Sequence, residues 1–95
     1  MSKAEAPVTE IAVEGDLLFS TVVAKRDALL KQLQSLQGIC RLNFAAVDRV
    51  DSSALSLWLC CLRYAQKRGL TLEIINPPDD LRSIAQLVGV DEQLH

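Results

Sequence analysis

The hydrophobic and polar positions along the chain repeat in two ways, every second residue in some segments and with helical spacing in others. The segments that alternate every second residue predict three strands. Alternating apolar and polar residues mark the segments 9–18, 39–44 and 71–75. Within the first segment, Gly15 and Asp16 are typical of a turn. The side chains expected to face a core are Ile11, Val13, Cys40, Leu42, Phe44, Leu72 and Ile74.

Helical spacing of apolar residues predicts helices over 21–37, 52–67 and 79–88. Ser20 is a candidate N-cap for the first of them, because a serine oxygen accepts hydrogen bonds from free N–H groups at a helix start. Glycine favours the left-handed conformation that ends many helices. The residues expected to end these three helices are Gly38, Gly69 and Gly89.

The regular order of strand, helix, strand, helix, strand, helix predicts an α/β domain with a mostly parallel sheet. Strands that are covered on both faces read as continuous apolar runs, whereas these strands alternate. We therefore expect the helices mainly on one face of the sheet and the other face partly open. Residues 1–8 are expected to form a flexible tail, and residues 9–95 a single domain.

The helix over 52–67 has more apolar surface than one side of a sheet requires. A core-facing stripe is already provided by Ala54, Trp58, Cys61, Leu62 and Ala65. Two explanations stay open: neighbouring helices cover both flanks in a crowded core, or a partner protein covers one of them. The surplus side chains are Leu55 and Leu59 on one flank and Leu57, Cys60 and Tyr64 on the other.

Three consecutive polar residues, Asp51, Ser52 and Ser53, precede this apolar helix. Asp51 or Ser52 can cap it, although capping accounts for only one of the three. A phosphate on Ser52 would lie in the favourable potential of the helix N-terminus and would add up to two negative charges to a contact surface. Ser52 is therefore a candidate phosphoacceptor.

If a partner protein covers this helix, its contact surface is expected at the helix start. Leu55 and Leu59 would provide the apolar part of that surface, and Arg63 a polar contact. The complete predicted set of partner-binding residues is Asp51, Ser52, Ser53, Leu55, Ser56, Leu59 and Arg63.

Composition narrows the classes of function. The 95 residues include 10 basic and 12 acidic side chains without a basic stripe, which argues against binding to nucleic acid or to an anionic membrane surface. The polar first ten residues and the lack of a long apolar run predict a cytoplasmic protein without direct membrane insertion. The chain has three cysteines, Cys40, Cys60 and Cys61, and two of them are adjacent, so we expect reduced thiols and no disulfide.

Candidate chemistry is sparse. The single histidine is the last residue, His95, so a Ser/His or Cys/His pair is not expected. Four glycines form no phosphate-binding loop, and no residues have metal-site spacing. We expect no catalytic residues, no cofactor and no metal. A small nucleotide-binding or hydrolytic protein remains the least favoured alternative.

The segment "VDRVDSSALSLWL" resembles the strand–loop–helix signature of STAS domains, the fold of sulfate-transporter tails and anti-sigma-factor antagonists. The segment "GLTLEIINPPDDLRSIAQLVGVDEQL" is similar to the STAS subunit of the bacterial lipid-asymmetry (Mla) ABC transporter. The resemblance covers about residues 9–94. One departure is Ala54, which stands where the signature usually has glycine.

The resemblance implies a STAS-like sheet of four to five mostly parallel strands and a function without catalysis. It implies a subunit that binds the ATPase of a phospholipid-transporting ABC transporter and supports its assembly and activity. Such a subunit would lie on the cytoplasmic side of the inner membrane, attached through its partner. The alternative that it implies is an anti-sigma-factor antagonist, which binds an anti-sigma factor or kinase and is regulated by phosphorylation of Ser52.

Overall fold

The computed structural model describes residues 7–87, which form an α/β domain of three strands and three helices in strict alternation. The three strands are parallel, in the spatial order β1-β2-β3, as the sequence predicts. The resemblance implied four or five strands, whereas this part of the chain contains three. The elements are β1 (Val8–Leu17), α1 (Val22–Leu33), β2 (Ile39–Val50), α2 (Ser52–Arg68), β3 (Thr71–Ile75) and α3 (Asp79–Leu87).

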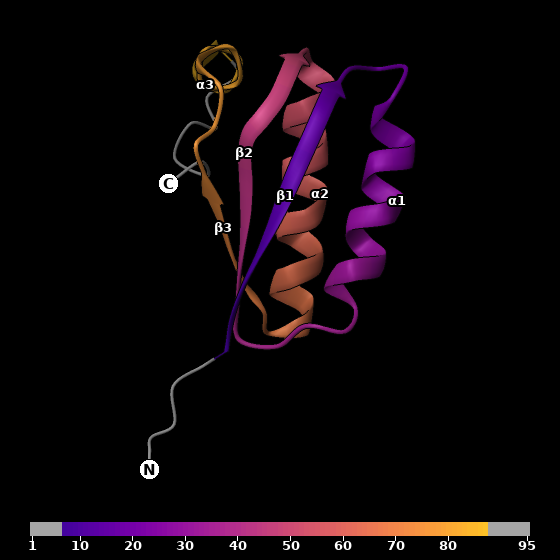
Figure 1. The fold of residues 1–95 in the computed structure, drawn as a ribbon, viewed down its shortest axis with the longest axis vertical. Helices are drawn as coiled ribbons and strands as arrows, with labels where there is room; N and C mark the ends of the chain where they lie inside the picture. Colours follow the sequence, from indigo (N-terminus) through magenta and orange to yellow (C-terminus); the bar gives the residue numbers. More distant parts are fainter. Residues whose placement is uncertain (1–6, 88–95) are drawn as a thin grey trace.

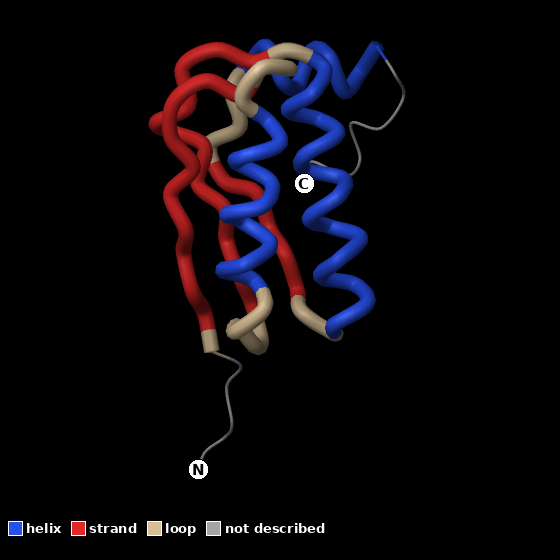
Figure 2. Tube along the Cα trace, turned by 90° about the vertical axis from the view of Figure 1, so that its right-hand side faces the viewer, coloured by secondary structure: helices blue, strands red, loops and turns tan. Residues whose placement is uncertain are grey.

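The helices α1 and α2 cover one face of the sheet, and the other face is open to solvent (Figures 1 and 2). The alternation in β2 explains this arrangement, because Cys40, Leu42 and Phe44 are each at most 1% exposed beneath the helices. On the open face, Arg41 Nε lies 2.9 Å from Glu73 Oε1 across the β2–β3 register. The prediction of a one-sided sheet is therefore confirmed.

The core is built from all six elements and contains no buried polar or charged residue in the described part of the chain. Trp58 of α2 lies at its centre with 1% of its surface exposed, which makes it a core residue. The helix α3 contributes Leu81 and Ala85, both fully buried, and packs beside α2. Both flanks of α2 therefore have a helical neighbour, α1 on one side and α3 on the other.

Two predicted features of β1 and β2 are wrong in detail. Gly15 and Asp16 form no turn, because β1 continues through them to Leu17. Gly15 has φ +81 and lies at a register shift between β1 and β2. A glycine there allows the backbone conformation that this irregularity of the strand requires. The strand β2 continues past Phe44 to Val50, held by pairing with β1.

The limits of α1 also differ from the prediction. Thr21, and not Ser20, occupies the N-cap position, and its hydroxyl donates to Asp16 O at 2.8 Å in the loop instead of capping the helix. The helix ends at Leu33 and not at residue 37. Gly38 has φ +80 and lies in the loop before β2, where a Cβ atom would stand 2.5 Å from the carbonyl oxygen of Pro7.

The other boundaries agree with the sequence more closely. The helix α2 begins at Ser52 and is ended by Gly69, whose φ is +71. The predicted strand over 71–75 is confirmed, and α3 begins at Asp79 as predicted. The predicted end of α3 at Gly89 and residues 1–6 of the predicted tail lie outside the described residues. The tail was predicted over residues 1–8, and at Val8 this prediction is wrong, because β1 begins there and pairs with Ile39 of β2.

Candidate functional site

The start of α2 is positioned by Asp51, which follows β2 directly. One carboxylate oxygen of Asp51 accepts a hydrogen bond from Ser53 N at 2.8 Å, so Asp51 is the N-cap. The other oxygen accepts a hydrogen bond from Phe19 N, 32 residues away, at 3.0 Å. Asp51 therefore fastens the loop between β1 and α1 to the first turn of α2.

The electrostatic state of Asp51 follows from these bonds. The N–H of Phe19, and after it that of Ser53, stabilises the ionised carboxylate and holds the pKa of Asp51 below its usual range. Asp51 N also donates to Leu17 O at 3.2 Å, which joins the end of β1 to the same turn. Both carboxylate oxygens are thus occupied within the chain, so the direct role of Asp51 is to hold the site together.

The hydroxyl residues of the predicted set are brought together on one stripe of α2. Ser52 and Ser56 are exposed one helical turn apart, and Arg63 is exposed two turns further along. Within residues 7–87, the side chains of Ser52 and Arg63 make no hydrogen bond or ion pair. Ser53 is half-buried, with its backbone held by Asp51. This set is called the α2 stripe below: Ser52, Ser56, Leu59 and Arg63.

The two leucines of the predicted set differ in burial. Leu55 is 5% exposed and belongs to the core, so the expectation that it offers open apolar surface is wrong. Leu55 belongs to the core cluster, and α2 has helical neighbours on both flanks, α1 and α3. Leu59 is half-buried against the core and keeps part of its surface open on the α2 stripe. The crowded-core explanation therefore holds for Leu55.

An apolar hollow that the sequence did not reveal lies beside the α2 stripe. It has a volume of about 390 Å³ and separates the first turns of α1 from the first half of α2. Phe19, in the loop before α1, is 83% exposed at its edge, and Val23 is 55% exposed. A large aromatic residue next to the polar pair Ser20-Thr21 was the sequence signal that could have drawn attention to it.

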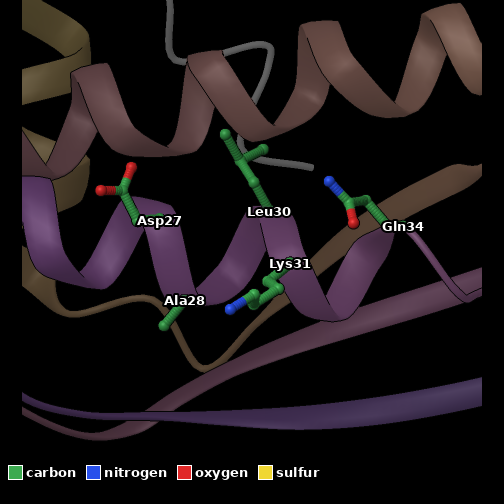
Figure 3. A pocket seen from close by; sticks show the side chains of 5 residues that line it. All are labelled: Asp27, Ala28, Leu30, Lys31 and Gln34. Atoms are coloured by element: carbon green, nitrogen blue, oxygen red, sulfur yellow. The ribbon is translucent and has the colours of Figure 1, made fainter.

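A second hollow lies on the outer side of α1. Asp27, Ala28, Leu30, Lys31 and Gln34 line it, and their side chains point in different directions from one helix (Figure 3). Asp27 Oδ1 is engaged by Arg26 Nη2 at 3.2 Å. A nucleophile with an adjacent base is not present there, so this surface offers no catalytic arrangement.

The thiols do not form a reactive group. Cys40 and Cys61 are fully buried, and burial raises the pKa of both, that of Cys61 to about 12. All three cysteines are free, and Cys60 is half-buried at the edge of the apolar hollow. In the part of the chain that the structure describes, no cluster of side chains could hold a metal ion. None of the described helices is long and apolar enough to cross a membrane.

The one-sided α/β sheet is the architecture of STAS domains, which are regulatory and accessory domains that act by binding other proteins. The family model described as "Mlab, STAS domain" matches residues 2–95, so the chain belongs to this family of STAS domains. The resemblance noted in the sequence is confirmed at the level of the STAS domain.

Solved structures support the fold. A sulfate transporter family protein from Wolinella succinogenes has 19% identity and a TM-score of 0.71, over 93% of this chain and 71% of that chain. The unphosphorylated form of the anti-sigma factor antagonist SpoIIAA has 23% identity and a TM-score of 0.70, over 98% of this chain and 80% of that chain. A search of curated proteins gave no match.

Proposed function

We propose that this chain is the accessory STAS subunit of an Mla-type ABC transporter that moves phospholipids, and that it binds the transporter's ATPase. The description of the matching family as an Mlab STAS domain supports this assignment. In this proposal the subunit lies on the cytoplasmic side of the inner membrane through its partner. It carries out no chemistry and supports the assembly and activity of the transporter.

The observation that carries the proposal is the α2 stripe at the start of α2. Small hydroxyl side chains at Ser52 and Ser56 let another backbone approach closely, and Leu59 beside them offers apolar surface. Arg63 has no partner within residues 7–87 and is available to a carboxylate of the ATPase. Burying a few hundred Å² of apolar surface at ~25 cal/mol per Å² provides several kcal/mol before the costs of association.

The test is co-purification with the ATPase of the proposed transporter, using a bulky substitution that leaves the core untouched. Ser56→Arg places a long cation in the middle of the α2 stripe, and we expect it to lower the affinity for the ATPase at least tenfold. The matched control is Ser35→Arg, because Ser35 is an exposed serine in the loop after α1. Both variants should unfold at the temperature of the wild type, since both positions are exposed.

Leu59→Asp provides a second, stronger perturbation of the same surface. A carboxylate at this half-buried position would meet the apolar part of the interface, so co-purification should be lost. Circular dichroism shows whether the variant still folds. Wild-type recovery of the ATPase with both Ser56→Arg and Leu59→Asp would rule out the α2 stripe as the docking surface.

Ser52 supports a second candidate, an anti-sigma-factor antagonist controlled by phosphorylation. Its hydroxyl is exposed at the first residue of α2, where the helix dipole favours a phosphate. Incubation with an anti-sigma-factor kinase from the same organism, followed by mass spectrometry, distinguishes the candidates. Stoichiometric phosphate that disappears in Ser52→Ala would favour the antagonist, and an unmodified Ser52 would favour the transporter subunit.

A further inference from the structure

Basic side chains gather where α1 and α2 end. The two helices run in the same direction along one face of the sheet and end at the same edge of the domain (Figure 1). The last two turns of α2 and the last turn of α1 carry exposed basic side chains and no carboxylate. This set is called the basic end below: Arg63, Lys67 and Arg68 of α2 and Lys31 of α1.

Carboxylates do not neutralise the basic end within the described part of the chain. The helix α2 contains no acidic residue, and α1 contains one, Asp27, which Arg26 engages at 3.2 Å. Asp51 stands at the opposite end of α2, a helix of 17 residues. The other ion pairs of the described residues join side chains of the strands to one another. The basic end therefore keeps its positive charge as open surface.

The ends of the two helices account for only part of this charge. Cations near a helix C-terminus face the partial negative charge of the last carbonyl groups, which is about half an elementary charge for each helix. The four cations of the basic end exceed the charge of the two helix ends severalfold. Arg63 moreover lies before the last turn of α2. Stabilisation of the helices therefore does not explain the whole set.

The guanidinium of Arg68 is held in a fixed position by uncharged groups. Its Nη2 donates to Gln34 O, just after α1, at 2.9 Å, and its Nη1 donates to the Tyr64 hydroxyl at 2.8 Å. The same group lies over the Tyr64 ring, 5.7 Å from the centroid. These partners position the cation and leave its charge in place. A positioned guanidinium suits a carboxylate at a defined place on a folded protein better than the mobile headgroups of a lipid surface.

The basic end continues the α2 stripe. Lys67 follows Arg63 one helical turn later, and Leu59 precedes Arg63 on the same stripe. We propose that the basic end binds an acidic surface of the ATPase, while Leu59 and the serines of the α2 stripe contact a less polar part of it. This inference rests on the proposed function and deepens it, because it names the charge of the partner surface and its place along α2. Complementary charge of this kind acts mainly on the rate of association.

The first experiment measures the association rate of the full chain with the purified ATPase at low and at high ionic strength. Lys67→Glu is expected to lower this rate roughly tenfold at low salt, and the difference should shrink to about twofold at high salt. The matched control is Arg82→Glu, which makes the same change of charge at an exposed position on α3 and should change the rate by less than about twofold. Equal effects of the two variants, or no effect of Lys67→Glu, would overturn the inference.

Carbodiimide crosslinking identifies the occupant, because this reagent joins a lysine amine to a carboxylate in direct contact with it. The inference expects a crosslink from Lys67 or Lys31 to an aspartate or glutamate of the ATPase. Lys67→Arg keeps the charge, so it should retain the wild-type association rate and lose the Lys67 crosslink.

Two other occupants would overturn the inference. One is the chain itself, shown by crosslinks that join the basic end to Asp91 or Glu92 and not to the ATPase. The other is a lipid surface, shown if Lys67→Glu abolishes binding to phosphatidylglycerol vesicles and leaves binding to the ATPase unchanged. If the wild type does not bind the ATPase, the proposed function itself fails, whereas wild-type binding that is insensitive to charge reversal at Lys67 refutes this inference alone.

Discussion

The contrast between Leu55 and Leu59 gives a quantitative test of how α2 is packed. Leu55 is 5% exposed, so Leu55→Ala removes buried apolar atoms and leaves a cavity. Substitutions of this kind cost ~2–5 kcal/mol, and we take about 3 kcal/mol. A chain of 95 residues is expected to have roughly 5–14 kcal/mol of stability in total. Leu55→Ala should therefore remove roughly a fifth to three fifths of it.

Leu59 is half-buried and borders solvent, so its truncation leaves no closed cavity. Leu59→Ala should cost about 1 kcal/mol, mostly from the lost transfer of apolar surface. For a domain of this size each kcal/mol shifts the melting temperature by ~4–8 °C. The expected shifts are about 15 °C for Leu55→Ala and about 5 °C for Leu59→Ala.

Urea unfolding followed by the fluorescence of Trp58 measures both variants. Trp58 is the single tryptophan and is 1% exposed, so its emission reports the loss of the core directly. The slope of the free energy of unfolding with urea should stay the same, because the unfolded chains expose similar areas. Equal losses in the two variants, or a loss below about 1 kcal/mol for Leu55→Ala, would refute the assignment of Leu55 to the core.

Two shorter predictions concern the backbone and the thiols. Gly38→Ala should lower the free energy of unfolding in urea by more than about 2 kcal/mol, because φ is +80 at Gly38 and the new Cβ would stand 2.5 Å from Pro7 O. Gly69→Ala should lower it by about 1 kcal/mol, because φ is +71 at Gly69 but the space around it is open. Similar costs would contradict this contrast. In native protein, iodoacetamide should alkylate half-buried Cys60 well before Cys61, because Cys61 is buried and its pKa is raised to about 12. Mass spectrometry measures both rates of alkylation, and equal rates would show that Cys61 is accessible.

The fold could be predicted because its signals are local. Alternation in β2 and β3, the glycine that ends α2 and the order of elements all depend on residues close in sequence. The errors lie where distant segments meet. Gly38 lies in the loop before β2, where Pro7 approaches it. Gly15 lies in a strand because β2 extends far enough to pair with β1 there.

The candidate site could be predicted in part for the same reason. Helical spacing alone places Ser52, Ser56 and Arg63 on one stripe, and the structure agrees. Spacing within α2 does not say how far neighbouring helices cover its flanks, so the burial of Leu55 does not follow from the sequence. The apolar hollow at Phe19 depends on the hydrogen bond between Phe19 and Asp51, two residues that are 32 positions apart.

This hydrogen bond makes the start of α2 sensitive to acid. Two backbone N–H groups hold the pKa of Asp51 below its usual range, so the ionised form is bound more tightly in the folded chain. An aspartate in an unfolded chain titrates near pH ~3.9. The stability from Asp51 is therefore complete well above that pH, and it is lost as the pH falls through the lowered value of the folded state.

Asp51→Asn removes this titration while it keeps one oxygen acceptor. We expect the variant to be less stable than the wild type at pH 7 and the difference to shrink as the pH falls below about 4. Asp16, whose pKa is lowered by a hydrogen bond from Arg49, contributes equally to both proteins and cancels in the comparison. Glu14→Gln is the control, because Glu14 is exposed and has no hydrogen bond or ion pair within residues 7–87. A stability difference for Asp51→Asn that stays constant from pH 7 to pH 2, measured by urea unfolding, would show that the carboxylate does not fasten Phe19 and α2 through its charge.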